Sequence, residues 1–161
     1  MSIQTDFVTI IIALLLLAPI ISLTNRIRKF RYRTKRRNSY ISKTIDEIDY
    51  LKGKEFEEYL EALFHKVGYK SQLTKGSHDC GADLVMKSDR KKIIIQAKRY
   101  KGTVGVKAVM EVYAAMAYYK ADEGYVFTNS TYTENAVELA EATGVILCDK
   151  NDIIRIRERI K

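Results

Sequence analysis

The first hydrophobic segment of the chain is continuous, whereas hydrophobic and polar positions alternate in most of the later segments. Residues Phe7 to Leu23 read FVTIIIALLLLAPIISL and contain no charged side chain. As a helix rising about 1.5 Å per residue, this run would be roughly 26 Å long, near the short end of what a hydrocarbon core of about 30 Å requires. The pattern predicts a single transmembrane anchor over residues 1–25.

A cleaved signal peptide and a buried core helix are the two alternatives. A signal peptide carries positive charge before its apolar run and a small-residue cleavage site after it, whereas here MSIQTD precedes the run and basic residues follow it. A helix that is apolar on every side has few places to pack in a domain of this size. The transmembrane anchor is therefore favoured.

A dense basic segment follows the apolar run. Between Arg26 and Arg37 the sequence RIRKFRYRTKRR holds eight of the 28 Lys and Arg residues in this chain of 161. We interpret residues 26–41 as a juxtamembrane linker that attracts anionic lipid, at about 1 kcal/mol per basic residue near the surface. By the positive-inside rule, the N-terminus lies outside the cell membrane and the remainder lies in the cytoplasm. Nucleic-acid contact is the alternative, because aromatic residues are interleaved with the charges.

Residues 42–161 are predicted to form one α/β domain. From Asn38 onward the chain is nearly neutral, with 20 basic and 19 acidic residues. Apolar residues at helical spacing predict a helix that ends at Gly68. The elements expected after it are strands at Lys70 to Thr74, Ala82 to Lys87, Lys91 to Lys98, Gly124 to Thr128 and Val145 to Asp149, and helices at Val106 to Lys120, Thr133 to Thr143 and the C-terminus. Strands alternating with helices indicate a mixed sheet covered on both faces.

A polar cluster follows the most hydrophobic of these strands. Its sequence, KKIIIQAKRY, places Gln96 and Lys98 on one strand face directly after three isoleucines. Burying an ammonium group costs several kcal/mol unless an anion pairs with it. A tight turn centred on Asp89 and Arg90 would set Asp83 opposite Gln96. We therefore expect Asp83 to provide the anion that Lys98 needs.

Spacing alone leaves two interpretations of this cluster open. One is a buried salt bridge with an added hydrogen bond. The other is a small open site at the end of the sheet, because Gly81 and Ala82 allow backbone or substrate to approach closely.

Two smaller features add expectations. Cys80 and Cys148 are too few for a disulfide framework and lack metal-ligand spacing, so both are predicted to be buried, reduced thiols. The segment Thr128 to Ser130 is predicted to close a turn and cap the helix that begins near Thr133, with contact to a backbone phosphate as the alternative.

Four segments together carry a resemblance to a known family. They are GKEFEEYLEALFHKVGYK (Gly53 to Lys70), HDCGADLVM (His78 to Met86), IIIQAKRY (Ile93 to Tyr100) and GYVFTNSTYTENAVELAEATGVILCD (Gly124 to Asp149). In this order they resemble the Mrr-type restriction endonucleases, a branch of the PD-(D/E)xK nuclease superfamily. The resemblance covers about Lys52 to Asp152 and implies a restriction-endonuclease-like mixed sheet flanked by helices over residues 42–161.

The resemblance also implies roles for individual residues. Asp83 matches the strand aspartate that holds a divalent metal, and Lys98 matches the catalytic lysine. Gln96 stands where most of the superfamily has Glu or Asp; Gln is usual in the Mrr branch and removes one negative charge from the metal site. Glu57 matches a helix glutamate that supplies a further metal or water ligand. The implied metal, Mg²⁺ or Mn²⁺, would therefore be held by Asp83, Gln96 and Glu57.

The implied activity is that of a membrane-anchored, metal-dependent endonuclease that hydrolyses DNA. A hard cation on carboxylate oxygens can activate water and stabilise charge on a phosphoryl group, and Lys98 would act there as a point charge. The alternative is a membrane-tethered nucleic-acid-binding module with a nuclease fold and little or no cleavage, which the neutral Gln96 favours. DNA is the implied partner, and a homodimer is the candidate assembly.

Overall fold

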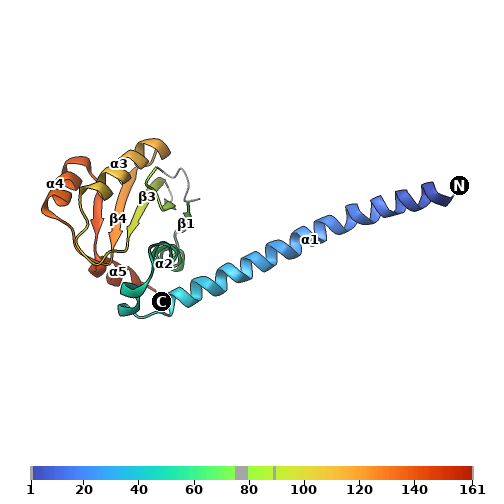
Figure 1. Cartoon of the computed structure of the whole chain (residues 1–161), viewed down its shortest axis with the longest axis horizontal. Coiled ribbons are helices and arrows are strands. Elements are labelled where there is room, and N and C mark those ends of the chain that lie inside the picture. The colour runs from blue at the N-terminus through green and yellow to red at the C-terminus, as the bar shows by residue number, and fades with distance from the viewer. Residues whose placement is uncertain (1, 75–79, 89, 161) are drawn as a thin grey trace. The chain divides into compact units, whose positions relative to one another are not determined.

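The protein is described by a computed structural model that covers residues 2–74, 80–88 and 90–160, with only the backbone path for residues 2–14. The chain divides into two compact units, residues 1–38 and residues 39–161. The first unit belongs to one helix, α1 (Ser2–Ile41), which is coloured blue to cyan in Figure 1.

Helix α1 contains both N-terminal segments that were singled out in the sequence. The basic run from Arg26 to Arg37 is helical, so the predicted linker is a continuation of the apolar helix. Within the residues whose side chains are described, no helix has both the length and the apolar character needed to cross a membrane. Residues 7–14 of the predicted anchor lie outside that part. Six large apolar side chains in the described remainder are each at least 50% exposed: Leu15, Leu16, Leu17, Ile20, Ile21 and Leu23.

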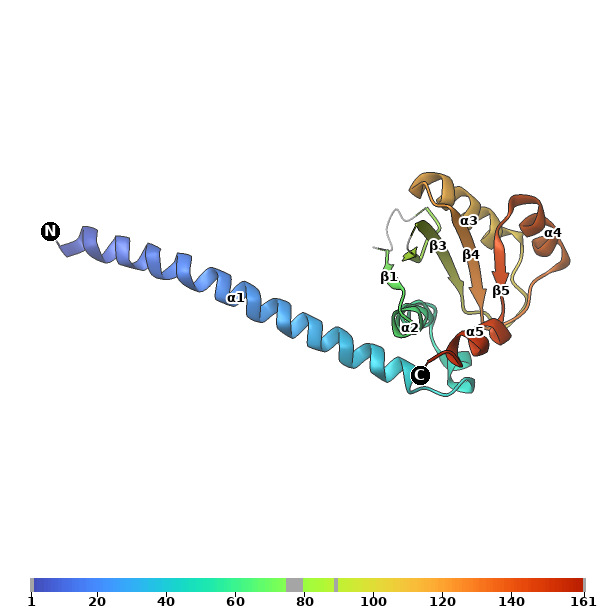
Figure 2. The same cartoon turned by 180° about the vertical axis from the view of Figure 1, so that it is seen from behind.

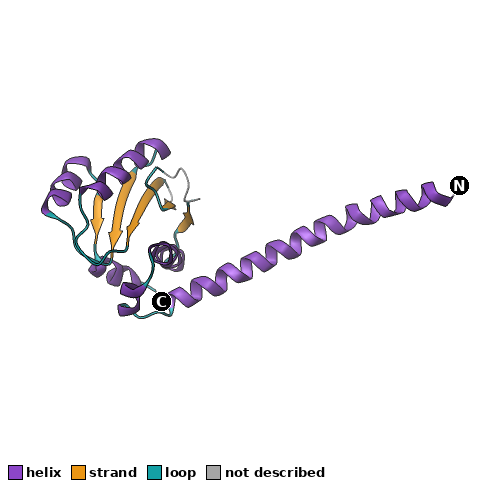
Figure 3. Cartoon of the chain, in the orientation of Figure 1, coloured by secondary structure: helices purple, strands orange, loops and turns teal. Residues whose placement is uncertain are grey.

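The second unit is built around a mixed β-sheet with helices on both faces (Figure 3). Its described elements, in chain order, are η1 (Asp46–Tyr50), α2 (Gly53–Lys66), β1 (Lys70–Leu73), β2 (Leu84–Ser88), β3 (Lys91–Lys98), α3 (Val106–Tyr119), β4 (Glu123–Thr128), α4 (Glu134–Thr143), β5 (Ile146–Cys148) and α5 (Lys150–Arg157). The strands lie in the order β1-β2-β3-β4-β5. Pairing is antiparallel from β1 to β3 and parallel from β3 to β5. The predicted mixed α/β architecture is confirmed.

Alternation along β3 assigns its side chains to two separate hydrophobic layers. Ile93 and Ile95 pack with the buried side chains of α2 and α5, whereas Ile94 packs with Ala115 of α3. Helices α3 and α4 therefore cover one face of the sheet and α2 and α5 the other, as Figures 1 and 2 show from two sides. Because both faces are buried, a run of three isoleucines is what such a strand requires.

The β2–β3 hairpin has the register predicted from its turn. Ser88 pairs with Lys91, and the backbone N–H of Asp83 donates to the carbonyl oxygen of Ile95 over 2.9 Å. Asp83 therefore lies just before β2, opposite Gln96 at the end of β3. Asp89, which the predicted turn placed at its centre, lies outside the described residues.

Candidate active site

Two hydrogen bonds from β3 fix the Asp83 carboxylate at the end of the sheet. Its Oδ2 atom accepts from the side-chain Nε2 of Gln96 and from the backbone N–H of Ala97, the latter over 2.7 Å. Gln96 itself is only 5% exposed. Because hydrogen bonds to an ionised acceptor are strong, this pair of donors holds the carboxylate against two neighbouring positions of one strand.

The side-chain oxygen of Gln96 is a buried hydrogen-bond acceptor without a partner among the described residues. Within the described part of the chain, this Oε1 atom is buried and accepts no hydrogen bond. Most buried side-chain polar atoms have a partner, and leaving one unsatisfied costs about 1 to 3 kcal/mol. The Asp83 carboxylate and the Gln96 amide therefore offer oxygen atoms that could bind a metal ion from opposed positions of two neighbouring strands. A bound cation would give the unpaired Gln96 oxygen its missing partner.

The ammonium group of Lys98 is paired with a residue that the sequence analysis missed. Its Nζ atom lies 2.7 Å from Oε2 of Glu111 in α3. Both side chains are about one-third exposed, at 33% and 28%. Among the described contacts, the carboxylate paired with Lys98 is that of Glu111, because α3 crosses the end of β3 and brings its own carboxylate to the ammonium; a direct contribution of Asp83 to this charge balance stays a prediction.

Gly81 allows α3 to come this close. Its φ of +88° lies in the left-handed region that favours glycine, and a Cβ there would lie 2.7 Å from Cβ of Glu111. Ala82 is fully buried with Ala115 of the same helix. The small residues before Asp83 therefore allow the close backbone approach that the sequence suggested: a Cβ at Gly81 would also lie 3.0 Å from the carbonyl oxygen of Glu111 in α3.

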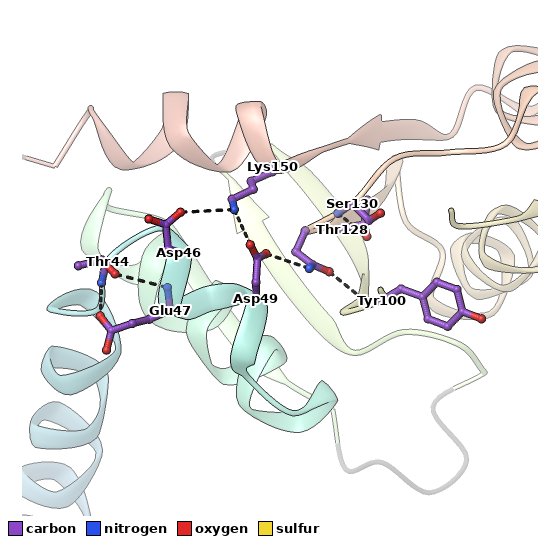
Figure 4. Close-up of polar contacts among 9 residues, drawn as sticks. Thr44, Asp46, Glu47, Asp49, Tyr100, Thr128, Ser130 and Lys150 are labelled. Carbon is purple, nitrogen blue, oxygen red and sulfur yellow. Dashed lines mark hydrogen bonds and ion pairs between the residues drawn. The ribbon is translucent and has the colours of Figure 1, made fainter. Parts of the chain in front are cut away.

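The segment Thr128 to Ser130 holds the backbone that follows Lys98. The hydroxyl of Thr128 donates to the carbonyl oxygen of Lys98 over 2.7 Å, and the side-chain oxygen of Asn129 accepts from the backbone N–H of Tyr100 over 2.8 Å. Figure 4 shows this contact to Tyr100 from the loop after β4. The N-terminus of α4 is capped by Thr133, whose hydroxyl accepts from the backbone N–H of Ala136. The predicted capping role of the earlier segment is therefore wrong, and that segment steadies the end of β3.

Asp49 of η1 extends this polar network to the N-terminus of α5. Its two carboxylate oxygens accept from Asn129 over 3.0 Å and from Lys150 over 2.6 Å, as Figure 4 shows. Burial raises the pKa of Asp49, but the hydrogen bonds from Lys150 and Asn129, together with the positive charges of Lys150 and Arg99, outweigh it and lower the pKa overall. One ionised carboxylate thus joins three segments that meet behind the end of β3.

The family of this chain is established by comparison with known proteins. A family model described as restriction endonuclease, the Mrr catalytic domain, matches residues 48–156. The matched range contains the β2–β3 hairpin, α3 and the loop after β4. The chain belongs to this restriction endonuclease family.

Individual relatives agree with that assignment. The type IV methyl-directed restriction enzyme EcoKMrr of Escherichia coli (strain K12) is 27% identical over 129 residues, which are 74% of this chain and 42% of the relative. This chain therefore spans less than half the length of that enzyme.

Two solved structures share the fold. The DNA modification-dependent restriction endonuclease AspBHI matches with a TM-score of 0.53 and 23% identity, over 77% of this chain and 35% of that one. The protein of unknown function AF1548 also matches with a TM-score of 0.53, at 18% identity, over 61% of this chain and 58% of that one.

Glu57 is placed differently from the other expected residues of this restriction endonuclease domain. It is half-buried on α2, the helix that packs on the Ile93 and Ile95 side of the sheet. Gln96 and Lys98 share the opposite side with Ile94, since side chains alternate along β3. Glu57 thus belongs to the layer across the sheet from Glu111, and its part in the site stays a prediction. His78 and Asp79, in one of the resembling segments, lie outside the described residues.

The two cysteines differ in exposure. Cys148 is buried and Cys80 is exposed, so the prediction of two buried thiols is wrong for Cys80, which lies just before the tight approach of Gly81 to α3. Burial raises the pKa of the Cys148 thiol to about 12.

Proposed function

We propose that this chain is a divalent-metal-dependent endonuclease that hydrolyses DNA phosphodiester bonds at Asp83, Gln96 and Lys98. The single observation that carries the proposal is the pair of oxygen donors at the sheet end, the fixed Asp83 carboxylate and the orphan Gln96 amide oxygen. Lys98 lies two positions further along the same strand face. Membership of the restriction endonuclease family supports DNA as the substrate.

The donor set fits Mg²⁺ or Mn²⁺. Among the residues that the structure describes, no three His, Cys, Asp or Glu side chains are grouped closely enough to hold a metal ion. Mg²⁺ is commonly bound by one or two carboxylates, while water and substrate phosphate complete its octahedron, so a full protein cage is not required. Asp83 would be the main ligand, Gln96 would add a neutral oxygen, and Glu57 is the proposed further carboxylate. When bound, the ion would supply Lewis acidity toward a phosphoryl oxygen.

The residues of the chain have distinct tasks in this proposal. Asp83 and Gln96 orient oxygen atoms at the end of the sheet, and the backbone of Ala97 keeps the carboxylate in place. Lys98 offers a compact positive charge to the phosphate or to the attacking water. Glu111 pairs with that charge from the side of α3 and so helps to position the ammonium.

The deciding experiment is cleavage of supercoiled plasmid by the full-length protein in Mg²⁺, with EDTA as the control. Asp83→Ala and Lys98→Ala should each abolish cleavage with unchanged circular dichroism, and Glu57→Ala should lower it by a smaller factor. Cleavage that persists in Asp83→Ala would assign the activity to another residue or to a contaminant.

A nucleic-acid-binding module with little or no cleavage is the second candidate function. It is favoured by the neutral side chain at Gln96, which leaves Asp83 as the only member of the hydrogen-bonded Asp83–Gln96 pair that can carry a negative charge. Retention of plasmid without nicking, in Mg²⁺ and in Mn²⁺, would support this candidate over the endonuclease.

We also propose that the N-terminal run holds the domain at the cell membrane as a single-pass anchor, with the N-terminus outside and the domain in the cytoplasm. The uncharged sequence from Phe7 to Leu23 and the eight basic residues after it support this orientation. Large apolar side chains from Leu15 to Leu23 are exposed, and insertion into the bilayer would remove them from water. A reporter fused after Lys161 should behave as cytoplasmic, and the protein should resist alkaline carbonate extraction. Recovery of the full chain in the soluble fraction would argue against the anchor.

A further inference from the structure

A groove lined by basic side chains lies at the opposite end of β2 and β3 from Asp83 and Lys98. It encloses about 670 Å³ beside the β2–β3 turn and the start of β1. We call it the hairpin groove and define it by its charged lining residues: Lys70, Lys87, Arg90, Lys91, Lys92 and Asp122. Five of these six are basic, in a unit whose basic and acidic residues nearly balance.

Three of the lysines form a row across three neighbouring strands. Lys70 is paired directly with Lys87 across β1 and β2, and Lys87 is paired directly with Lys92 across β2 and β3. Directly opposed residues project from the same face of a sheet, and like charges at such positions repel. In the isolated protein the electrostatic energy of this lysine row is unfavourable. An anion bound in the groove would make it favourable.

Two acidic residues described next to the row, Asp122 and Glu123, already have partners. Asp122 accepts from the backbone N–H of Lys92 over 2.7 Å, and Glu123 is paired with Lys91. The ammonium of Lys92 donates to the carbonyl oxygen of Tyr119 at the end of α3 over 2.7 Å, and this neutral acceptor does not cancel its charge.

The other two lysines of the row, Lys70 and Lys87, lack an acidic partner among the residues that the structure describes. Among the described residues, neither Lys70 nor Lys87 forms an ion pair, and both are exposed. Within the described part of the chain, the groove therefore presents positive charge that no acidic side chain pairs with at Lys70 or Lys87.

The lysine row faces the same side of the sheet as the candidate active site. Lys87 has the parity of Asp83 along β2, and Lys92 has that of Gln96 along β3. Four residues separate the two levels, which is about 13 Å along a strand, or the axial rise of roughly four base pairs. Between them, Val85 and Ile94 are covered by α3, so the groove would meet a stretch of nucleic acid distinct from the one at Lys98.

We propose that the hairpin groove binds the phosphodiester backbone of the DNA substrate outside the segment that is cleaved. This inference rests on the proposed endonuclease function. Lysines recognise phosphate as point charges, and contacts to phosphate carry no sequence information directly, so binding at the groove would not depend on sequence. A concave groove fits a curved polyanion, whereas the headgroups of a flat membrane surface would not reach its floor.

The test compares two variants of the full-length protein that lose the same charge at different places. In Lys70→Gln/Lys87→Gln the row is dismantled, while Lys54→Gln/Arg159→Gln removes two exposed basic side chains outside the groove. Affinity for a fluorescently labelled duplex is measured by anisotropy in EDTA, over a series of salt concentrations. The groove variant should bind on the order of tenfold more weakly, and the slope of log affinity against log salt should fall by about 1.8 for two lost phosphate contacts. The control variant should bind like wild type.

Folding and charge are checked separately. Removing the repulsion between Lys70 and Lys87 should leave the melting temperature equal or higher, and Lys70→Arg/Lys87→Arg should retain wild-type affinity. Equal affinities for the groove variant and the control would overturn the inference. So would a groove variant that keeps its DNA affinity but loses binding to micelles containing phosphatidylglycerol, which would assign the groove to lipid.

The outcomes also separate this inference from the proposed function. If wild type cleaves plasmid and the groove variant binds DNA as tightly as wild type, the nuclease proposal stands and the groove proposal fails. If the groove variant binds DNA more weakly but wild type does not cleave plasmid, the groove proposal stands and the nuclease proposal fails.

Discussion

Lys98 and Glu111 are joined by an ion pair of 2.7 Å between Nζ and Oε2, which connects the end of β3 to α3. A second basic residue, Lys107, lies 3.9 Å from the other carboxylate oxygen of Glu111 and is 88% exposed. Glu111 therefore makes one close, partly shielded contact and one loose, solvent-exposed contact. Only the first is placed to influence a reaction at the end of the sheet.

Replacing Glu111 by Gln should lower kcat for DNA cleavage and leave KM nearly unchanged. The amide keeps the size of the side chain but loses the charge that directs the Lys98 ammonium, and small misplacement of a catalytic group costs about 10- to 100-fold in rate. Steady-state cleavage kinetics of the full-length protein measure both parameters. The matched control is Lys107→Gln, which removes the exposed partner and should retain near-wild-type kcat, since exposed ion pairs contribute little. An unchanged kcat in Glu111→Gln would show that Lys98 needs no positioning by α3.

Mg²⁺ should raise the melting temperature of the wild-type protein by mass action. Asp83→Asn should abolish this dependence with little loss of stability in EDTA, because the amide oxygen can still accept from Ala97 but carries no charge for the metal. Thermal melting over a Mg²⁺ titration at fixed ionic strength tests this. If the wild type is indifferent to Mg²⁺ and the variant melts far lower in EDTA, Asp83 is a structural residue and not a metal ligand.

Asn129→Ala should destabilise the fold by about 1 to 2 kcal/mol and reduce cleavage. The substitution leaves the backbone N–H of Tyr100 without its acceptor and removes one donor from Asp49, and unsatisfied polar groups cost on this scale. Urea unfolding measures the first effect and plasmid cleavage the second. Asn135→Ala, on the exposed surface of α4, is the control and should change neither; equal behaviour of the two variants would remove the proposed role of this network.

The stabilising contribution of Asp49 should depend on pH. Its pKa is lowered in the folded protein, so ionisation favours the folded state above the ordinary pKa of about 3.8, and that contribution is lost as the pH falls through the lowered value. Asp49→Asn should therefore melt below wild type at pH 7, and the difference should shrink as the pH falls below the ordinary pKa of about 3.8. A difference that stays constant as the pH falls would mean that the carboxylate contributes through shape and not through charge.

The two thiols should react at very different rates. Burial raises the pKa of Cys148 to about 12, and since the thiolate is the reactive form, iodoacetamide at pH 8 should spare this residue in the native protein. The exposed Cys80 should be alkylated under the same conditions. Peptide mass spectrometry before and after denaturation distinguishes them, and rapid native labelling of Cys148 would contradict the buried environment.

The sequence by itself determined the features that depend on near neighbours along the chain. The three isoleucines of β3 predicted a strand buried on both faces, and the length of the turn placed Asp83 opposite Gln96, a register that the structure reproduces. Strand alternation then put Gln96 and Lys98 on one face. Each of these results from local geometry, since the period of a strand and the size of a tight turn leave little freedom.

Only the tertiary structure decided which side chains meet across the elements. How the helices cross the sheet decides three of these contacts and positions. It brings Glu111 to Lys98 and Asp49 to Asn129, and it places Glu57 in the opposite helix layer. Asp49 and Asn129 are 80 positions apart, and no periodicity in the chain relates them. A hydrophobic pattern specifies which face of a helix is buried, but its rotation and crossing are set by packing against side chains from distant segments, here by the missing Cβ of Gly81 under α3.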